Sequence, residues 1–429
     1  MVLQVAGELD ATHSNGSIGA SADAWRNSMR RVIEFIYIDS GGGHRAAAQA
    51  LAEVIERQQR PWDVHMVSIQ DLFDSIDVIR KSTGIAFQDV YNIMLRHGWT
   101  FGSAQLVPLM HAVIRLLHGS QVKVLTRHWA KTRPDMVVSL IPHYNRAFQV
   151  ALESVCPGTP LVTVLTDIAD YPPHFWLERQ SQYVICGSRR AVAQARALGL
   201  DPAHVLEASG MILNPRFYQP LNLDRGRERE RLGLDPERLT GIVLFGGEGS
   251  LEMLKIARVL DGAGLPTQLI LLCGRHQEAA RALRAIARRI PMRVEGFTRE
   301  VPHFMALADY FIGKPGPGSI SEALAMRLPV VVERNAWTLV HERYNADWVL
   351  EKGVGVVVGS FSELPAAVRE LLDPVRYQGY RERAAAVRNS AVFEIPEMLA
   401  EIFQRKDRAL RLPLLAAETA KRSAHWAAS

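Results

Sequence analysis

The chain has 429 residues, enough for about two to three domains, and its 48% hydrophobic and 22% charged residues are typical of a soluble globular protein. Its Lys and Arg residues exceed its Asp and Glu residues by only five, which predicts no nucleic-acid partner but suits an anionic substrate or an anionic membrane surface. The three isolated cysteines are expected to be reduced core residues of a cytosolic protein. The sequence contains no uncharged apolar run of about 18 residues, so we expect no transmembrane helix.

The first segment predicts no fold. Residues 1–31 are rich in Ser, Gly, Ala and Asn and lack the basic start and apolar core of a signal peptide, so we expect a disordered lead-in. The run VIEFIYI (residues 32–38) then predicts a buried strand, and GHRAAAQALAEVIERQ predicts the helix after it. Further strand candidates in this half are DVHMVSI, DMVVSLI, PLVTVLTD and YVICGS.

Residues 82–117 depart from this alternation. The segment carries Phe, Tyr, Trp and Met beside Arg96 and His97. Aromatic residues next to basic ones suit a lipid interface, so this segment is either an apolar lid that contacts a membrane or a set of ordinary helices packed on the sheet.

The second half repeats the strand–helix pattern. Its strand candidates are GIVLFGG, TQLILLCG, MRVEGF, YFIGK and LPVVVE. Alternating strands and helices predict a parallel sheet, so we expect an α/β protein with two Rossmann-like domains that face a cleft. We place a first domain at residues 32–218, a second domain at 219–380 and a further helix at 381–404.

The tail at residues 405–429 is basic, with six Lys and Arg residues against two Asp and Glu residues. Leu410, Leu412, Leu414, Leu415 and Trp426 give it an apolar component as well. The tail is therefore expected either to lie on an anionic bilayer or, as we favour, to be disordered and solvated.

The first candidate site follows the first strand. Gly41, Gly42 and Gly43 lead into the helix, and glycines there let a ligand approach the backbone at a helix N-terminus. His44 is expected in the first helical turn, where a neutral imidazole suits a general base for a hydroxyl. The alternative is that His44 only caps or packs the helix. Neither GxGxxG nor a P-loop motif is present.

The second half carries a matching set of loops. LFGGEGS (residues 244–250) is another glycine cluster after a strand. The turn from Gly316 to Ser319 is expected to open a helix whose free N–H groups bind a diphosphate. Glu322 either accepts hydrogen bonds from ribose hydroxyls or pairs with Ser319 in a capping box. Phe297, at a strand end, offers an aromatic edge to a base.

Together these segments resemble a known family. DSGGGHRAAAQAL, VTVLTD, FGGEGS, LLCGR, VEGF and GKPGPGSISEALAMRLPVVV are similar, in order, to motifs of the monogalactosyldiacylglycerol synthase group. These inverting GT-B glycosyltransferases use a nucleotide sugar and are related to the peptidoglycan N-acetylglucosaminyltransferase and to bacterial diacylglycerol glucosyltransferases. The resemblance spans about residues 32–358, and the combination of GGGHR with GPG-S-x-x-E-A is specific to the group.

The resemblance implies a UDP-hexose donor in the C-terminal domain (residues 219–380) and a diacylglycerol acceptor in the N-terminal domain (residues 32–218), without a metal or another cofactor. It also implies that the helix at 381–404 crosses back to the first domain, as in other GT-B proteins. It implies that His44 is the catalytic base. The donor-binding positions that it implies are Gly246, Gly247, Glu248, Phe297, Gly316, Gly318, Ser319, Glu322, His341 and Glu342.

One position departs from the family. Where the group has a Gln-Glu pair that reads the sugar hydroxyls, this chain has His341 and Glu342. An imidazole has a different geometry and charge from an amide, so the sequence leaves galactose and glucose open as the donor sugar.

The expected reaction is transfer of a hexose from UDP-hexose to diacylglycerol with inversion, by a peripheral protein on the cytoplasmic face of a membrane. Asp167, at the end of PLVTVLTD, is expected to orient or charge-balance His44, or alternatively to cap the next turn. The alternatives to this function are transfer to another lipid or to a polyprenyl-linked cell-wall acceptor, and a non-catalytic UDP-sugar-binding regulator.

Overall fold

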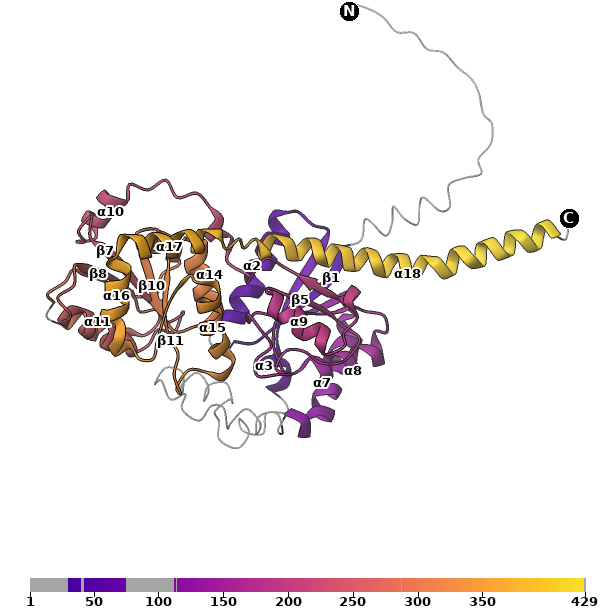
Figure 1. The fold of residues 1–429 in the computed structure, drawn as a ribbon. Helices are drawn as coiled ribbons and strands as arrows, with labels where there is room; N and C mark the ends of the chain where they lie inside the picture. Colours follow the sequence, from indigo (N-terminus) through magenta and orange to yellow (C-terminus); the bar gives the residue numbers. More distant parts are fainter. Residues whose placement is uncertain (1–29, 40–41, 75–111, 113, 287, 428–429) are drawn as a thin grey trace, which may run out of the picture.

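The computed structural model describes residues 30–39, 42–74, 112, 114–286 and 288–427. Two six-stranded sheets, parallel in every strand pair, make up two lobes (Figure 1). The predicted α/β architecture with two Rossmann-like domains is therefore confirmed. The lead-in to residue 29 and the aromatic-rich segment, apart from residues 112 and 114–117, lie outside the described residues.

The first sheet has the strand order β2-β1-β3-β4-β5-β6. Because β1 lies between β2 and β3, the chain leaves it in opposite directions, and ligands of open α/β sheets bind at such a switch point. Its strands are β1 (Arg31–Tyr37), β2 (Trp62–Ser68), β3 (Met136–Ser139), β4 (Leu161–Val164), β5 (Tyr183–Cys186) and β6 (Val205–Glu207). Its helices are α2 (Gly43–Arg57), α3 (Ile69–Phe73), α7 (His118–Thr132), α8 (Asn145–Val155), α9 (Arg189–Ala197), η2 (Pro202–His204) and η3 (Pro215–Tyr218).

The second sheet has the order β12-β11-β10-β7-β8-β9, with its switch point between β7 and β10. Its strands are β7 (Leu239–Leu244), β8 (Thr267–Leu272), β9 (Met292–Glu295), β10 (Tyr310–Gly313), β11 (Val330–Glu333) and β12 (Gly355–Val358). The helices are α10 (Arg225–Arg231), α11 (Glu252–Gly262), α12 (Gln277–Ala285), α13 (Val301–Ala306), α14 (Pro317–Ala325), η4 (Val340–Glu342), α15 (Arg343–Lys352), η5 (Phe361–Glu363), α16 (Leu364–Leu372) and α17 (Pro374–Ala386).

The sequence patterns missed two strands, β6 and β12. Each forms one edge of its sheet. Strand β6 has only three residues, of which one is buried, and β12 begins at the second glycine of a Gly-Val-Gly stretch. Strand β6 is too short to show the apolar run or the alternation that marks a strand, and the glycines at the start of β12 indicate a turn in sequence.

The last helix, α18 (Ala391–Ala427), belongs to the first lobe although it follows the second. The link at residues 387–390, between α17 and α18, crosses from the second lobe to the first, and α18 then runs along the first lobe and continues beyond it (Figure 1). Its Ile395, Leu399 and Ile402 share a buried cluster with Leu51 and Ile55 of α2. The disordered tail that the sequence favoured is a wrong prediction, because the helix continues to Ala427 through Ala, Leu, Arg and Lys residues that favour helix.

No helix among the described residues combines the length and the apolar character needed to cross a bilayer.

Candidate active site

The first half of the site is built at the switch point of the first sheet. Gly42 has φ +80°, the left-handed conformation that glycine adopts without strain, and α2 begins at the next residue. His44 is thus the second residue of α2, directly above the end of β1. Its Nδ1 lies 2.8 Å from the carbonyl oxygen of Leu140, just beyond β3, so this hydrogen bond spans the crevice between the two strands.

This hydrogen bond decides the tautomer of His44. A carbonyl oxygen only accepts, so we assign the proton to Nδ1 and the lone pair to Nε2. The hydroxyl oxygen of Thr166, after β4, also lies 3.0 Å from Nδ1. Among the described residues Nε2 has no hydrogen-bond partner. His44 therefore presents an acceptor nitrogen that is held in a fixed orientation from behind.

Burial lowers the pKa of His44 to about 4; the bond to Leu140 opposes this shift and the charge of His341 adds to it. The imidazole is therefore neutral at pH 7, the protonation state that a general base requires.

Asp167 does not contact His44 in the way expected from sequence. Its Oδ2 accepts a 2.8 Å hydrogen bond from the indole Nε1–H of Trp176, and the Trp176 ring lies 5.9 Å from that of His44. Orientation of His44 thus comes from Leu140 and Thr166, which the sequence analysis did not select. Burial raises the pKa of the Asp167 carboxyl, while the charges of His341 and Lys314 lower it.

The loop around residues 170–177 shapes this side of the cleft. The Asp170 carboxylate accepts hydrogen bonds from the backbone N–H groups of His174 (2.9 Å) and Trp176 (2.6 Å), which fixes the loop. Phe175 then stacks on His341 of the second lobe, with ring centroids 5.5 Å apart and planes 9° apart. The only signal for this contact in sequence is the aromatic pair Phe175-Trp176, which no motif marks.

The second half of the site is the start of α14. Gly316 is its N-cap in an extended conformation, and Pro317 occupies the first helical turn. Because proline lacks an N–H, the first N–H groups without intrahelical partners are those of Gly318 and Ser319. No side chain caps the helix, so the capping box of Ser319 with Glu322 is not formed.

Glu322 lies on the second turn of α14, partly buried, and its carboxyl group has no hydrogen-bond partner among the described residues. Burial raises the pKa of its carboxyl to about 7. A carboxylate held this way can accept two hydrogen bonds from vicinal hydroxyls.

Lys314 and Glu342 form an ion pair beside this turn. Lys314 follows β10, and its Nζ lies 2.6 Å from Oε1 of Glu342, whose side chain is almost fully buried. A Cβ atom on Gly316 would lie 3.6 Å from the same oxygen. The sequence analysis selected Glu342 but not Lys314, although Lys314 belongs to the same GKPGPGS motif as Gly316, Gly318 and Ser319.

A third group lies on the loops after β7, β8 and β9. Gly246 has φ +72°, and the Gly247 carbonyl accepts a 2.9 Å hydrogen bond from the N–H of Arg275. The Arg275 side chain bonds Glu248 at 3.1 Å and lies 4.7 Å from the centre of the Phe297 ring. Phe297 is 54% exposed, so its other face is open to a flat ligand such as a base.

The structure thus gathers the predicted residues into three groups, and His341 brings the second lobe into contact with the first at Phe175. Gly42, Gly43 and His44 lie in the first lobe, and Gly41 lies outside the described residues. Among the described residues no group of three or more His, Cys, Asp or Glu side chains is arranged to hold a metal ion.

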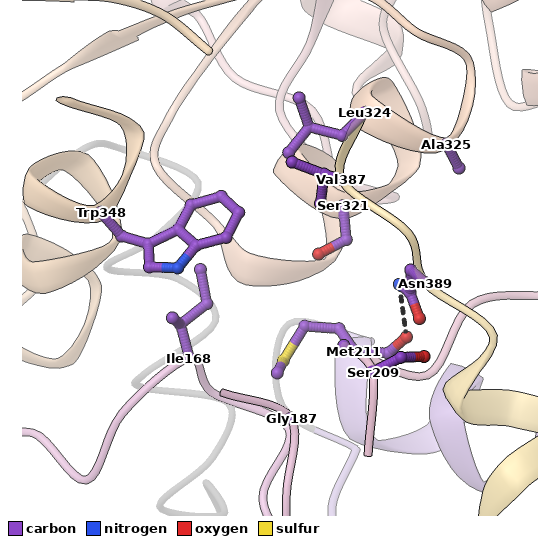
Figure 2. Close-up of a pocket in the computed structure, with 11 residues that line it drawn as sticks. Ile168, Gly187, Ser209, Met211, Ser321, Leu324, Ala325, Trp348, Val387 and Asn389 are labelled. Carbon is purple, nitrogen blue, oxygen red and sulfur yellow. Dashed lines mark hydrogen bonds between the residues drawn. The ribbon is translucent and has the colours of Figure 1, made fainter. Parts of the chain in front are cut away.

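A small pocket opens where the chain crosses between the lobes (Figure 2). Ile168 and Met211 come from the first lobe and Trp348 from the second, and Figure 2 shows them around one space. Asn389 donates a 2.9 Å hydrogen bond to the Met211 carbonyl. This bond attaches the link between α17 and α18 to the first lobe. Ile168 is next to Asp167 in the chain, so the pocket adjoins the candidate site.

No family model matches the chain. Among curated proteins it is similar to the chloroplastic monogalactosyldiacylglycerol synthase of Spinacia oleracea, with 27% identity over 88% of this chain and 74% of the relative. Monogalactosyldiacylglycerol synthase 1 of Arabidopsis thaliana is 26% identical over 86% of this chain and 70% of the relative. The monogalactosyldiacylglycerol synthases are homologues of this chain. The resemblance in the sequence motifs is therefore confirmed.

Solved structures bear on the fold alone. MurG of Acinetobacter baumannii superposes with a TM-score of 0.55 at 14% identity and covers 87% of this chain and 99% of MurG. MnaA of S. aureus, solved with UDP, gives 0.55 at 15% identity over 85% of this chain and 94% of MnaA. The GT-B fold is confirmed.

Proposed function

We propose that this protein is an inverting glycosyltransferase that moves a hexose from UDP-hexose to diacylglycerol. The observation that carries the proposal is the state of His44: neutral, with Nδ1 bound to Leu140 and Nε2 directed away from that bond, at the switch point of the first sheet. The charge of His341, from the second lobe, acts on His44 and on Asp167, so a base and a donor-binding lobe meet here. The names of the homologues support diacylglycerol as the acceptor and galactose as the first sugar to test.

In the proposed reaction the acceptor hydroxyl oxygen forms a bond to C1 of the hexose. The bond between C1 and the diphosphate oxygen breaks on the opposite face, and its electron pair leaves with UDP. The hydroxyl proton passes to Nε2 of His44. A positioned base of this kind contributes about 10²- to 10⁴-fold in rate.

The second lobe would bind the departing UDP. The free N–H groups of Gly318 and Ser319 and the positive end of the α14 dipole suit the diphosphate. Glu322 suits the ribose hydroxyls, and the exposed face of Phe297 suits the uracil. We propose that this arrangement works without a divalent metal, at the cytoplasmic surface of an anionic membrane.

The test is lipid glycosylation by the purified full chain. UDP-galactose and UDP-glucose are offered separately with vesicles that contain diacylglycerol, and UDP binding is measured by calorimetry. We expect a glycolipid from one donor and none from His44→Ala, which should still bind UDP. UDP binding without transfer to diacylglycerol would move the acceptor to another lipid or a polyprenyl-linked intermediate. UDP binding without transfer to any lipid would favour a regulator.

A further inference from the structure

We propose that Lys314 is a catalytic residue that binds the distal phosphate of the nucleotide and neutralises the charge that develops there as the sugar leaves. The inference rests on the proposed function and deepens it, because none of the groups assigned above supplies a full positive charge to the diphosphate.

The backbone around Lys314 is held rigidly. Lys314 is the first residue after β10, and its carbonyl oxygen accepts a 2.8 Å hydrogen bond from the N–H of Gly316. The side-chain amide of buried Asn345 donates to the carbonyl oxygen of Pro315 at 2.8 Å. The turn that carries Lys314 is therefore fixed relative to the start of α14.

The ammonium group is placed over that helix start. A Cβ atom on Gly316, the N-cap, would lie 3.7 Å from Cε of Lys314 and 3.6 Å from Oε1 of Glu342. The ion pair therefore packs on the residue that precedes the free N–H groups of Gly318 and Ser319. A phosphate that binds those N–H groups would come close to the ammonium group.

The ion pair leaves Lys314 with capacity to bind. An ammonium group has three N–H donors, and the Glu342 carboxylate takes one of them at 2.6 Å. The Lys314 side chain is 36% exposed, whereas that of Glu342 is 6% exposed. The buried partner thus fixes the cation, and the exposed side of the cation faces the solvent that a ligand would replace.

The position of the ammonium group also fits the reaction. Lys314 and Glu342 both act electrostatically on Asp167, across the cleft beside His44. A phosphate bound by Lys314 would therefore lie on the face of the second lobe that is turned towards Asp167 and the proposed base. A preorganised donor at the site of developing charge is worth about 10²- to 10³-fold in kcat.

The test compares UDP with UMP, which lacks the distal phosphate. Their dissociation constants are measured by calorimetry for the full-length wild type, Lys314→Gln and a matched control, Lys255→Gln. Lys255 lies on α11 of the same lobe, where its Nζ contacts Ser360 at 3.4 Å. We expect Lys314→Gln to weaken UDP binding about tenfold and to leave UMP binding within about twofold, because a charge-assisted hydrogen bond is lost only for UDP. Lys255→Gln should change neither.

A double variant separates this role from a structural one. Removing Lys314 alone leaves the Glu342 carboxylate buried without its cation, which destabilises the fold. In Lys314→Gln/Glu342→Gln that charge is gone, and we expect the melting temperature to recover while the preference for UDP over UMP stays reduced.

Three outcomes would overturn the inference. Recovery of the UDP preference in the double variant would mean that Lys314 only neutralises Glu342. An unchanged preference in Lys314→Gln, in a protein that still transfers sugar, would remove the inference and leave the proposed function intact. A wild type that binds neither nucleotide would remove both.

Discussion

The two glycine-rich turns of the cleft look alike in sequence and act differently in the structure. Both follow a strand at a switch point and both open a helix. Gly42 adopts φ +80° and places His44 on the first turn of α2, so that turn presents a side chain. Gly316 is extended with ψ 133° and precedes a proline, so the α14 turn presents backbone N–H groups. The same kind of signature thus presents a side chain, the proposed base, in one lobe and backbone N–H groups, the proposed anion site, in the other.

The largest expected effect comes from a substitution at His44, the side chain that the Gly42 turn presents. His44→Gln removes the base but keeps a side chain that can bond the Leu140 carbonyl. We expect kcat to fall about 10²- to 10⁴-fold while the dissociation constant of UDP stays unchanged. Initial rates and UDP calorimetry on the same preparations measure both. Activity close to wild type would place the base elsewhere.

A substitution at the α14 turn of the second lobe should weaken binding of the UDP-sugar and leave the rate of the chemical step almost unchanged. Glu322→Gln replaces a carboxylate acceptor for the ribose hydroxyls with a neutral amide. At pH 8 we expect the KM for the UDP-sugar to rise about tenfold with little change in kcat, since the ribose contact is made before and during the reaction. A fall in kcat without a rise in KM would contradict the contrast between the two turns.

The two turns should also differ in their pH dependence. The pKa of Glu322 is about 7 and that of His44 about 4 in the free protein. The kcat/KM for the donor reports such free-protein values, so it should decline as pH falls below about 7, where Glu322 gains a proton. In Glu322→Gln the decline should begin only near pH 4, where His44 gains a proton. A limb near pH 7 that survives this substitution would belong to another group.

Removing the second hydrogen-bond partner of His44, the Thr166 hydroxyl, should have a smaller effect on kcat than removing His44 itself. Thr166→Val removes the hydroxyl that shares Nδ1 with the Leu140 carbonyl, which remains in place. We expect kcat to fall about two- to tenfold, the range of one neutral hydrogen bond. Thr166→Ser should retain the wild-type rate. Equal losses in the two variants would indicate a packing role for the Thr166 methyl group.

The smallest expected effect is on the stability of the fold, which should decrease as the pH rises. The folded chain holds the Glu322 proton to about pH 7, above the ordinary value of 4.5, so its stability falls as pH rises through this window. Glu322→Gln should therefore raise the melting temperature at pH 8 and leave it unchanged at pH 4.5. Thermal unfolding at both values checks this, and a lower melting temperature at pH 8 would argue against burial as the cause.

The sequence by itself determined the two-lobed α/β fold and the homology. Long apolar runs such as residues 32–38 predict buried strands regardless of context, and the glycine motifs lie between strand and helix, where backbone constraints keep them recognisable. The edge strand β6 was missed because three residues are too short to carry a pattern, and β12 because it begins within a glycine-containing stretch that indicates a turn.

Only the tertiary structure decided which residues meet. His44 is bonded by Leu140 and Thr166, which are 96 and 122 residues away, and Asp167 turns to Trp176 instead. Phe175 meets His341 across the cleft, and Lys314 meets Glu342 beside Gly316. These contacts depend on strand order and on how two lobes face each other, and a one-dimensional pattern contains neither. The residue types of the site could be read along the chain, whereas their partners, their protonation and the contacts from which we propose a role for Lys314 depend on packing.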